Sequence, residues 1–185
     1  MAKSKEIKKH WAPVLATREF GNMELAEIPY TEPKTLLGRV LTVNLYVITN
    51  DSRKQDAELS FKITSFDGKS ASTELVGYKI LNAYIKRVIR KAKEKVDDSF
   101  ECESKDNVKM KIKPFFITKS KTKNSVVTKL RMNIRQMMTE YSKTIEFEKL
   151  IRETTTNNLQ RNLKQELKKI YPLNLLELRE IVRIK

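Results

Sequence analysis

Residues 107–139 read NVKMKIKPFFITKSKTKNSVVTKLRMNIRQMMT and combine two periodicities with a single sign of charge. From Val108 to Lys113 apolar residues alternate with lysines, which predicts a strand with one buried and one solvated face. Ser125 is a suitable helix cap, and the apolar residues after it recur at helical spacing to about Ser142. Nine residues of the stretch are Lys or Arg and none is acidic. A strand, a turn and the start of a helix are therefore all expected to present positive charge.

The segments before this stretch predict further strands. Alternation over residues 38–48 and 59–64 indicates two strands with one buried face each. Asp67-Gly68 is a common hairpin turn, and it leads to a strand at residues 72–76. After Gly77 the period changes to that of an amphipathic helix whose apolar stripe runs from residue 81 to 92. Its other faces are strongly basic, and a phosphate-binding face and a merely solvated face are equally good interpretations.

A short strand is expected within residues 96–104. It would carry Glu101 and Glu103 on its polar side. If it neighbours the strand of residues 108–113, these acids would partly neutralise Lys109, Lys111 and Lys113. The strand lysines are therefore weaker candidates for an external ligand than the lysines of the turn.

The residues after Ser125 are predicted to be mostly helical. Further helices are expected over about 145–151 and 159–170, separated by the Thr- and Asn-rich segment 154–158. A leucine stripe at 159, 163 and 167 is better explained by core burial than by a coiled coil, because it is too short for sustained heptads. Alternation over residues 176–184 predicts a last strand that pairs back into the sheet.

Residues 1–35 have no sustained period and are predicted to form an irregular basic arm, with one globular domain over residues 36–185. Prolines, charges and isolated aromatics are mixed in this segment. Such an arm could be free or could lie along a surface. Docking through Trp11 and Phe20 is favoured, because an indole ring is costly to leave in water.

The charge of the 185-residue chain indicates a polyanionic partner. Its net charge is +15 and its sequence pI is near 9.8. Nucleic acid is the first candidate partner, an anionic membrane surface the second, and an inert basic protein is the remaining alternative. No apolar run approaches the length of a bilayer span, and the first residues are charged where a secretory signal would be apolar. A cytoplasmic protein with no membrane partner is expected.

The residue types give little support to catalysis or metal binding. His10 is the only histidine and Cys102 the only cysteine, which argues against a catalytic triad and against Cys or paired-His metal sites. No glycine-rich phosphate loop occurs. The adjacent carboxylates Asp97 and Asp98 are expected to be solvated and not to hold a cation. No enzyme activity, cofactor, metal or small-molecule substrate is therefore expected.

Four segments, taken in order, resemble one ribosomal family. They are KKHW near the start, LLGRVLTVNL, KIKPFFITKSKTKNSVVTKLRMNIRQMM and KKIYPLNLLELREIVRIK. No single segment is specific, but together they resemble the small-subunit ribosomal protein family of archaea and eukaryotes called S3Ae, or eukaryotic-type S1. The resemblance covers nearly the whole chain. Because the chain lacks the longer terminal extensions of eukaryotic members, it is more similar to an archaeal one.

The resemblance implies an α+β fold with a central, barrel-like antiparallel sheet flanked by helices. It also implies a position on the platform of the small subunit, near the messenger exit and the 3′ end of the small-subunit RNA. Protein neighbours are implied there, and a catalytic centre is not.

The expected function is that of a structural, RNA-binding constituent of the small ribosomal subunit, bound to the ribosome in the cytoplasm. Its contacts should be mainly to phosphates and so largely independent of sequence. The expected partners are small-subunit ribosomal RNA, neighbouring ribosomal proteins on the side of residues 140–180, and messenger RNA near the exit. A free-standing RNA-binding regulator and a protein-only scaffold that works through the C-terminal helices are the alternatives.

The candidate RNA-binding residues are the cations of the arm, of the first helix and of the basic turn and its helix, together with one aromatic residue that could stack on a base. They are Lys3, Lys5, Lys8, Lys9, Trp11, Lys86, Arg87, Arg90, Lys91, Lys119, Lys121, Lys123, Lys129, Arg131 and Arg135.

Overall fold

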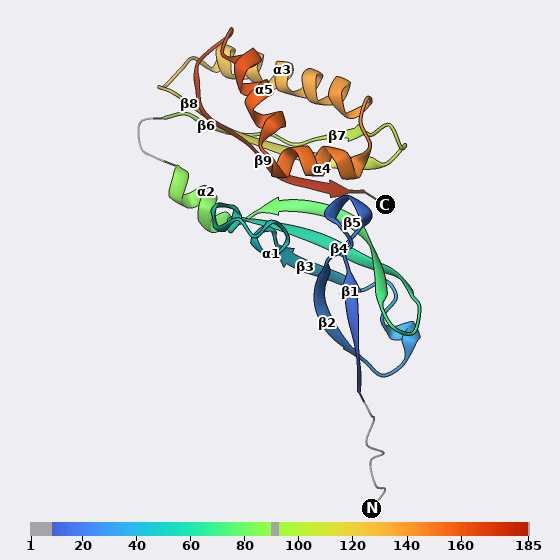
Figure 1. The fold of residues 1–185 in the computed structure, drawn as a ribbon. Coiled ribbons are helices and arrows are strands. Elements are labelled where there is room, and N and C mark those ends of the chain that lie inside the picture. Colours follow the sequence, from blue (N-terminus) through green and yellow to red (C-terminus); the bar gives the residue numbers. More distant parts are fainter. Residues whose placement is uncertain (1–8, 90–92, 185) are drawn as a thin grey trace, which may run out of the picture. The chain divides into compact units, whose positions relative to one another are not determined.

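The computed structural model describes residues 9–89 and 93–184 (Figure 1). Its contacts divide the chain into two compact units. Unit 1 is the described part of Met1–Gln55 together with Leu59–Val76. Unit 2 is Asp56–Glu58 together with the described part of Gly77–Lys185. Each unit is described by itself below.

Unit 1 is built from short strands and helical turns. Its elements are β1 (His10–Leu15), η1 (Arg18–Phe20), β2 (Glu24–Tyr30), η2 (Pro33–Thr35), β3 (Val40–Asn44), α1 (Leu45–Thr49), η3 (Ser52–Lys54), most of β4 (Ala57–Phe66) and the first part of β5 (Ala71–Ile80). Strand β1 pairs antiparallel with β2 and parallel with β5, while β4 pairs with β3 and β5. A small apolar core forms from Ala12, Val14, Leu36, Ile63 and Ala71.

The prediction of an irregular arm is wrong for residues 9–35, because this segment forms β1 and β2. Ala12 and Val14 are fully buried and alternate with more exposed residues, so a two-residue period is present. Pro13 interrupts that period in the sequence but is tolerated in the strand, since β1 pairs with β5 only through Val14 and Leu15. Residues 1–8 lie outside the described residues, and the domain boundary at residue 36 stays a prediction.

The predicted strand over residues 38–48 ends early, at Asn44. The Asn44 Oδ1 atom accepts a hydrogen bond from the Tyr46 backbone N–H (2.9 Å) and so caps α1. Asn50, in the left-handed conformation (φ 51°), ends this helix. A side-chain cap thus overrides the alternation of the sequence, and Val47, which was predicted to be buried, is exposed.

The predicted hairpin between β4 and β5 is confirmed. Leu59, Phe61 and Ile63 are buried, and the Asp67 N–H donates to the Ser70 carbonyl oxygen (3.1 Å) around the turn. Gly68 has φ 82°, a conformation that favours glycine. Strand β5 runs to residue 80, beyond the predicted end at 76, so the next helix starts later than its pattern indicated.

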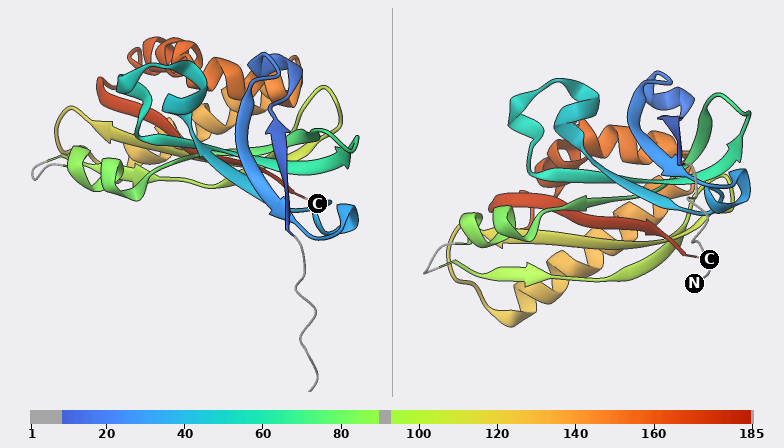
Figure 2. Two further views of the ribbon diagram at one scale, coloured as in Figure 1. Left: turned by 60° about the horizontal axis from the view of Figure 1, so that its bottom comes forward. Right: turned by 90° about the horizontal axis from the view of Figure 1, so that it is seen from below.

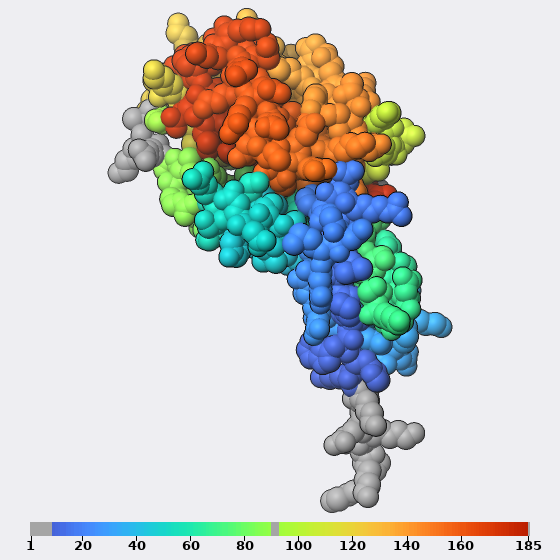
Figure 3. Space-filling model, in the orientation of Figure 1, coloured from blue at the N-terminus to red at the C-terminus, as the bar shows by residue number. Residues whose placement is uncertain are grey.

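Unit 2 combines the rest of the strands with the longer helices. Its further elements are α2 (Asn82–Val88), β6 (Lys95–Asp97), β7 (Phe100–Glu103), β8 (Lys109–Thr118), α3 (Asn124–Ser142), α4 (Phe147–Thr155), α5 (Asn158–Leu167) and β9 (Leu173–Arg183). Strand β9 lies between β5 and β8 and is antiparallel to both. The other edge of β8 pairs with β6 and β7. Helices α3, α4 and α5 cover one face of these strands (Figure 2), and they form the continuous orange-to-red surface in Figure 3.

The sequence patterns of unit 2 are largely confirmed. Met110 and Ile112 of β8 are fully buried while Lys109 and Lys111 are exposed. The leucine stripe of α5 is buried, as core packing predicts, and the last strand does pair back into the sheet.

The α+β class is confirmed, with nine strands and five α-helices in the described residues. The barrel-like antiparallel sheet is not confirmed, because the sheet is not closed and the β1–β5 pair is parallel. Within residues 9–89 and 93–184, no helix is long and apolar enough to cross a membrane.

Gly77 marks a close approach of β5 to β9, which leads to our first prediction. A Cβ atom at this position would lie 2.7 Å from the Ile181 carbonyl oxygen, and that atom belongs to the backbone of β9. Gly77→Ala must therefore push the two strands apart, and we expect it to lower the free energy of unfolding by about 1–3 kcal/mol. Urea unfolding measures this loss. Ser65→Ala, at an exposed position of β4, should change stability by less than about 0.5 kcal/mol, and equal stability of both variants would contradict the prediction.

Candidate nucleic-acid interface

The turn between β8 and α3 gathers exposed lysines on an anchored backbone. Its exposed cations are Lys119, Lys121 and Lys123. The Lys119 N–H donates to the Pro172 carbonyl oxygen (3.1 Å), and the Ser120 hydroxyl bonds the Tyr171 hydroxyl (2.7 Å). In the part of the chain that the structure describes, none of the three lysines takes part in an ion pair. Fixed backbone with unneutralised side chains is suited to binding an extended anion.

The first turn of α3 continues this positive surface. Lys123 is the N-cap residue, no side chain caps the helix, and the first turn holds no acid. The prediction that Ser125 is the cap is therefore wrong, since Ser125 lies inside the helix. Free N–H groups and the helix dipole favour negative charge at this end. The dipole thus adds to the field of the turn lysines instead of opposing it.

Helix α3 carries two more candidates close to this end, on different sides of the helix. Lys129 and Arg131 are both exposed. No described residue forms an ion pair with Lys129, whereas the charge of Arg131 contributes to a lower pKa of Asp98. With the turn lysines they make up what we call the basic edge, which comprises Lys119, Lys121, Lys123, Lys129 and Arg131.

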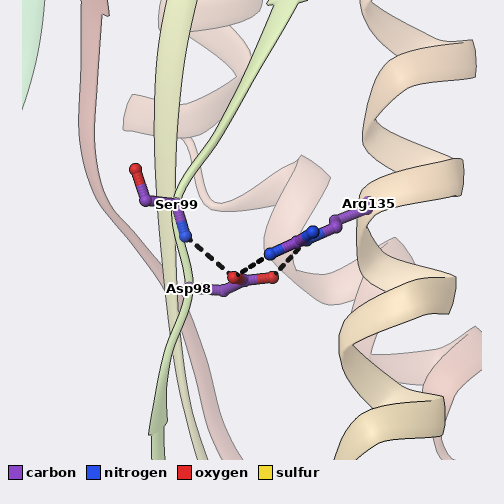
Figure 4. A network of polar contacts seen from close by, with 3 residues as sticks. All are labelled: Asp98, Ser99 and Arg135. Atoms are coloured by element: carbon purple, nitrogen blue, oxygen red, sulfur yellow. Dashed lines mark hydrogen bonds and ion pairs between the residues drawn. The ribbon is translucent and has the colours of Figure 1, made fainter.

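Arg135 differs from the cations of the basic edge because it forms two hydrogen bonds with the carboxylate of Asp98. Its Nε and Nη2 atoms donate to the two oxygens of Asp98 at 2.7 and 2.5 Å (Figure 4). The Asp98 side chain is only 8% exposed, and it also accepts from the Ser99 N–H (3.0 Å). The hydrogen bond from Arg135 is the main cause that lowers the pKa of Asp98. The prediction that Asp98 is solvated is wrong, and Arg135 has fewer free donors to offer a phosphate.

The predicted pairing of the strand lysines' strand with the acidic strand before it is confirmed, but the one ion pair among the described strand lysines involves a different acid. In the β7–β8 register, Glu101 lies opposite Lys111 and Glu103 opposite Lys109. Lys113 forms an ion pair with Glu180 of β9. This group of cations is therefore a poorer binding surface than the basic edge.

Helix α2 supplies fewer free cations than its pattern indicated. Arg87 pairs with Asp56 (2.7 Å), and its guanidinium lies 5.5 Å from the centroid of the Tyr84 ring. Lys86 is exposed. The candidates Arg90 and Lys91 lie outside the described residues.

Only some of the N-terminal candidates lie within the described residues. Lys3, Lys5 and Lys8 lie outside the described residues, and Lys9 is exposed. Trp11 is 63% exposed on β1, so the prediction that it docks is wrong, whereas Phe20 does pack against Phe61 with ring centroids 6.0 Å apart.

A partly buried acid in unit 2 was not found by sequence reasoning. Burial raises the pKa of Glu177 on β9 to about 7, although the Gln160 side chain and the charge of Lys164 act in the opposite direction. Tyr78 of β5 is buried beside it, and burial together with the Glu177 charge raises the pKa of this phenol. These groups lie inside unit 2 and are not part of the basic edge. Among the described residues, no group of three or more His, Cys, Asp or Glu could hold a metal ion.

Comparison with known proteins identifies the family of the chain. The model of the ribosomal S3Ae family matches residues 2–185. The chain belongs to the ribosomal S3Ae family. Small ribosomal subunit protein eS1 of Nanoarchaeum equitans is 32% identical over 165 residues, which are 89% of this chain and 83% of the relative. The eS1 protein of Methanothermobacter thermautotrophicus is 30% identical over 170 residues, 92% of this chain and 87% of the relative.

The family assignment confirms the resemblance found in the four sequence segments. In this S3Ae member, the exposed lysines of the basic turn directly precede the exposed cations in the first half of α3. Arg87 and Arg135 are less available to a ligand, because each forms an ion pair with an aspartate. Asp56 and Asp98 lie 31 and 37 residues from these arginines, and no local pattern indicates such pairs.

Proposed function

We propose that this chain is a structural constituent of the small ribosomal subunit that binds ribosomal RNA through phosphate contacts and so supports translation. The observation that carries the proposal is the basic edge of unit 2, in a chain that belongs to a ribosomal protein family. Membership in this family gives the chain a structural and not an enzymatic role.

The electrostatics of the basic edge support phosphate binding. Four of its five cations have no acidic partner among the described residues, and the uncapped start of α3 adds a positive dipole end. Lysine and arginine contacts to phosphates supply sequence-independent affinity and orient a protein on RNA. The edge therefore fits an RNA backbone, with Lys86, Lys9 and the N-terminal lysines as further contacts.

The resemblance to the family supports a specific position of the chain on the small subunit. The chain would lie on the platform of the small subunit, near the messenger exit, bound to the ribosome in the cytoplasm. Its partners there would be ribosomal RNA, neighbouring ribosomal proteins and messenger RNA at the exit.

Two alternatives predict different behaviour. A free-standing RNA-binding regulator would use the same basic edge away from the ribosome. A protein-only scaffold would use the C-terminal helices, but the leucine stripe of α5 is buried within unit 2 and offers no apolar surface for this.

Sucrose-gradient sedimentation tests the proposal. We expect the chain to migrate with small ribosomal subunits and to stay bound through moderate salt. Recovery only in the light fractions at all salt concentrations would contradict it and would favour the regulator. Ultraviolet crosslinking of the bound chain, followed by peptide mapping, should then place RNA adducts on residues 119–131.

Arg135 provides a second prediction, which separates a phosphate contact from an internal ion pair. Arg135→Ala should leave the salt dependence of RNA binding unchanged and should lower the free energy of unfolding by about 1 kcal/mol, because Asp98 loses its partner. Lys129→Ala should do the reverse, with a change in the log–log salt slope of about 0.7–0.9 and unchanged stability. Filter binding to small-subunit RNA over a range of salt, with thermal unfolding, measures both quantities. A salt slope reduced by Arg135→Ala would show that Arg135 contacts RNA after all.

A further inference from the structure

Charge is distributed unequally between the two units. The described residues of unit 2 include 24 Lys and Arg against 15 Asp and Glu. The described residues of unit 1 include 8 against 7. Most of the positive charge that suits RNA therefore belongs to unit 2. The described part of unit 1 is nearly neutral and offers little electrostatic attraction to a phosphate backbone; Lys3, Lys5 and Lys8 lie outside it.

Exposed apolar side chains show the opposite distribution. In the described part of unit 1 they are Trp11, Met23, Leu37, Val40, Tyr46 and Val47, whereas unit 2 shows Ile89 and Met132. A neutral surface with exposed large apolar residues is typical of a protein interface. Trp11 has the largest exposed fraction in this group of unit 1, and tryptophan is the residue type most enriched at the energetic centres of such interfaces.

The residues around Trp11 follow from the β1–β2 register. Trp11 lies opposite Pro29, Pro13 opposite Glu27, and Leu15 opposite Glu24. The intervening residues Ala12 and Val14 are fully buried, so the first two pairs share the other, outer face of the hairpin. This outer face thus combines a tryptophan and two prolines with the exposed acid Glu27. The register shifts between Val14 and Leu15, and Glu24 is exposed beyond that shift.

The charge on the outer face opposes RNA and favours a basic protein. Glu24 and Glu27 are exposed, and no described residue forms an ion pair with either. At Pro29 the Arg39 Nη1 atom donates to the carbonyl oxygen (3.1 Å), and the guanidinium keeps its positive charge there. Lys9 precedes the strand. Glu27, diagonal to Trp11 in this register, and Glu24, at the far end of the hairpin, would repel an approaching phosphate and attract lysine or arginine.

We propose that the outer face of the β1–β2 hairpin docks a basic segment of a neighbouring protein. Trp11, Pro13 and Pro29 supply the apolar contact, and Glu24 and Glu27 pair with cations at its rim. The proposal rests on the proposed function, because the neighbour is a component of the same small subunit. It differs from a base-stacking role for Trp11, which would bring RNA to this face.

Site-specific photocrosslinking distinguishes these partners. The full chain carrying Trp11→benzoylphenylalanine is bound to small ribosomal subunits and irradiated, and the adduct is digested separately with ribonuclease and protease. We expect a ribonuclease-resistant adduct whose partner peptide is rich in Lys and Arg. Met132→benzoylphenylalanine, which is 67% exposed on α3 beside the basic edge, is the matched control and should yield an RNA adduct.

Each other outcome of this experiment overturns the proposal. An RNA adduct at position 11 would establish base contact in its place. A chain that sediments with the subunit but gives no adduct at position 11 would show that the outer face is unoccupied. Failure to sediment with the subunit at all would contradict the proposed function itself, and so it is separable from failure of this inference.

Charge reversal gives a second test, because an RNA partner and a basic protein partner lead to opposite changes in affinity for the subunit. The double variant Glu24→Lys, Glu27→Lys replaces two negative charges with two positive ones and so raises the net charge by four. If RNA covers the outer face, affinity for the subunit rises. If a basic protein segment covers it, affinity falls by about tenfold or more through like-charge contact. Binding of the same variant to protein-free small-subunit RNA should not weaken, and a loss there would point to misfolding, which circular dichroism detects.

Discussion

Replacing Lys119, Lys121 and Lys123 together with glutamate is expected to abolish stable binding to the small subunit. Each lysine is exposed on an anchored turn, so the change removes three phosphate contacts and adds three repulsive charges. Losing three contacts should reduce the log–log salt slope by about 2–3 and the affinity by about a thousandfold near physiological salt. Stability should change by less than about 0.5 kcal/mol, because the side chains contact solvent.

A matched variant controls for net charge. Lys34, Lys62 and Lys69 are exposed in unit 1, and replacing them with glutamate alters the charge of the chain by the same amount. We expect this control to keep most of its affinity. Sedimentation with small subunits at several salt concentrations compares the two. If both variants bind equally well, the basic edge is not the RNA contact and the protein-only scaffold is the better description.

Glu177→Gln is expected to stabilise the protein at alkaline pH and to have little effect at acidic pH. Burial raises the pKa of Glu177 from 4.5 to about 7 in the folded state. The folded chain therefore binds this proton more tightly than the unfolded chain does, and stability falls as pH rises from about 4.5 to 7. The loss amounts to at most about 3 kcal/mol above pH 7. Glutamine keeps an N–H donor at the site and does not ionise, so it avoids that loss.

Urea unfolding of both proteins from pH 4 to pH 8.5 measures this difference. Between pH 4.5 and 7 the free energy of unfolding of the variant should rise relative to that of the wild type. Above pH 7 the difference should stay constant. Glu101→Gln, which removes an exposed carboxylate of β7, should show no such gain. A constant difference between Glu177→Gln and the wild type across the range would mean that burial does not hold Glu177 in its protonated form.

Periodicity predicted the parts of the fold in which one face of an element is buried. Helix α3 and strand β9 were predicted within a few residues, since alternation and helical spacing reflect the burial of residues such as Leu130. The burial of Met110 and Ile112 likewise revealed the first half of β8, but the strand continues past Pro114 to Thr118, beyond the predicted end. Prediction failed where a local contact decides the backbone. Asn44 starts a helix inside an alternating segment, and Pro13 and Pro29 conceal the paired strands β1 and β2.

The sequence predicted the centre of the basic edge correctly, but it did not show which nearby cations are excluded from it. A run of residues without an acid shows where positive charge is uncompensated locally, and this identified Lys119, Lys121 and Lys123. It could not show that Asp98 would reach Arg135, because that pair depends on how the segment between β6 and β7 lies against α3. The exposed Trp11 was missed for a related reason, since the cost of a solvated indole says nothing about a partner outside the chain.

The position of β9 has a consequence for synthesis. This strand follows all the other described elements in the sequence, yet it lies between β5 and β8 and joins them. While the chain emerges from a translating ribosome, β5 and β8 each present an open strand edge until β9 is made. The sheet of unit 2 can therefore be completed only after its middle strand, β9, has been translated. The lysines between β8 and α3 leave the exit tunnel before that. Rapid capture of such a chain by RNA or by a chaperone would protect those edges from pairing with other chains.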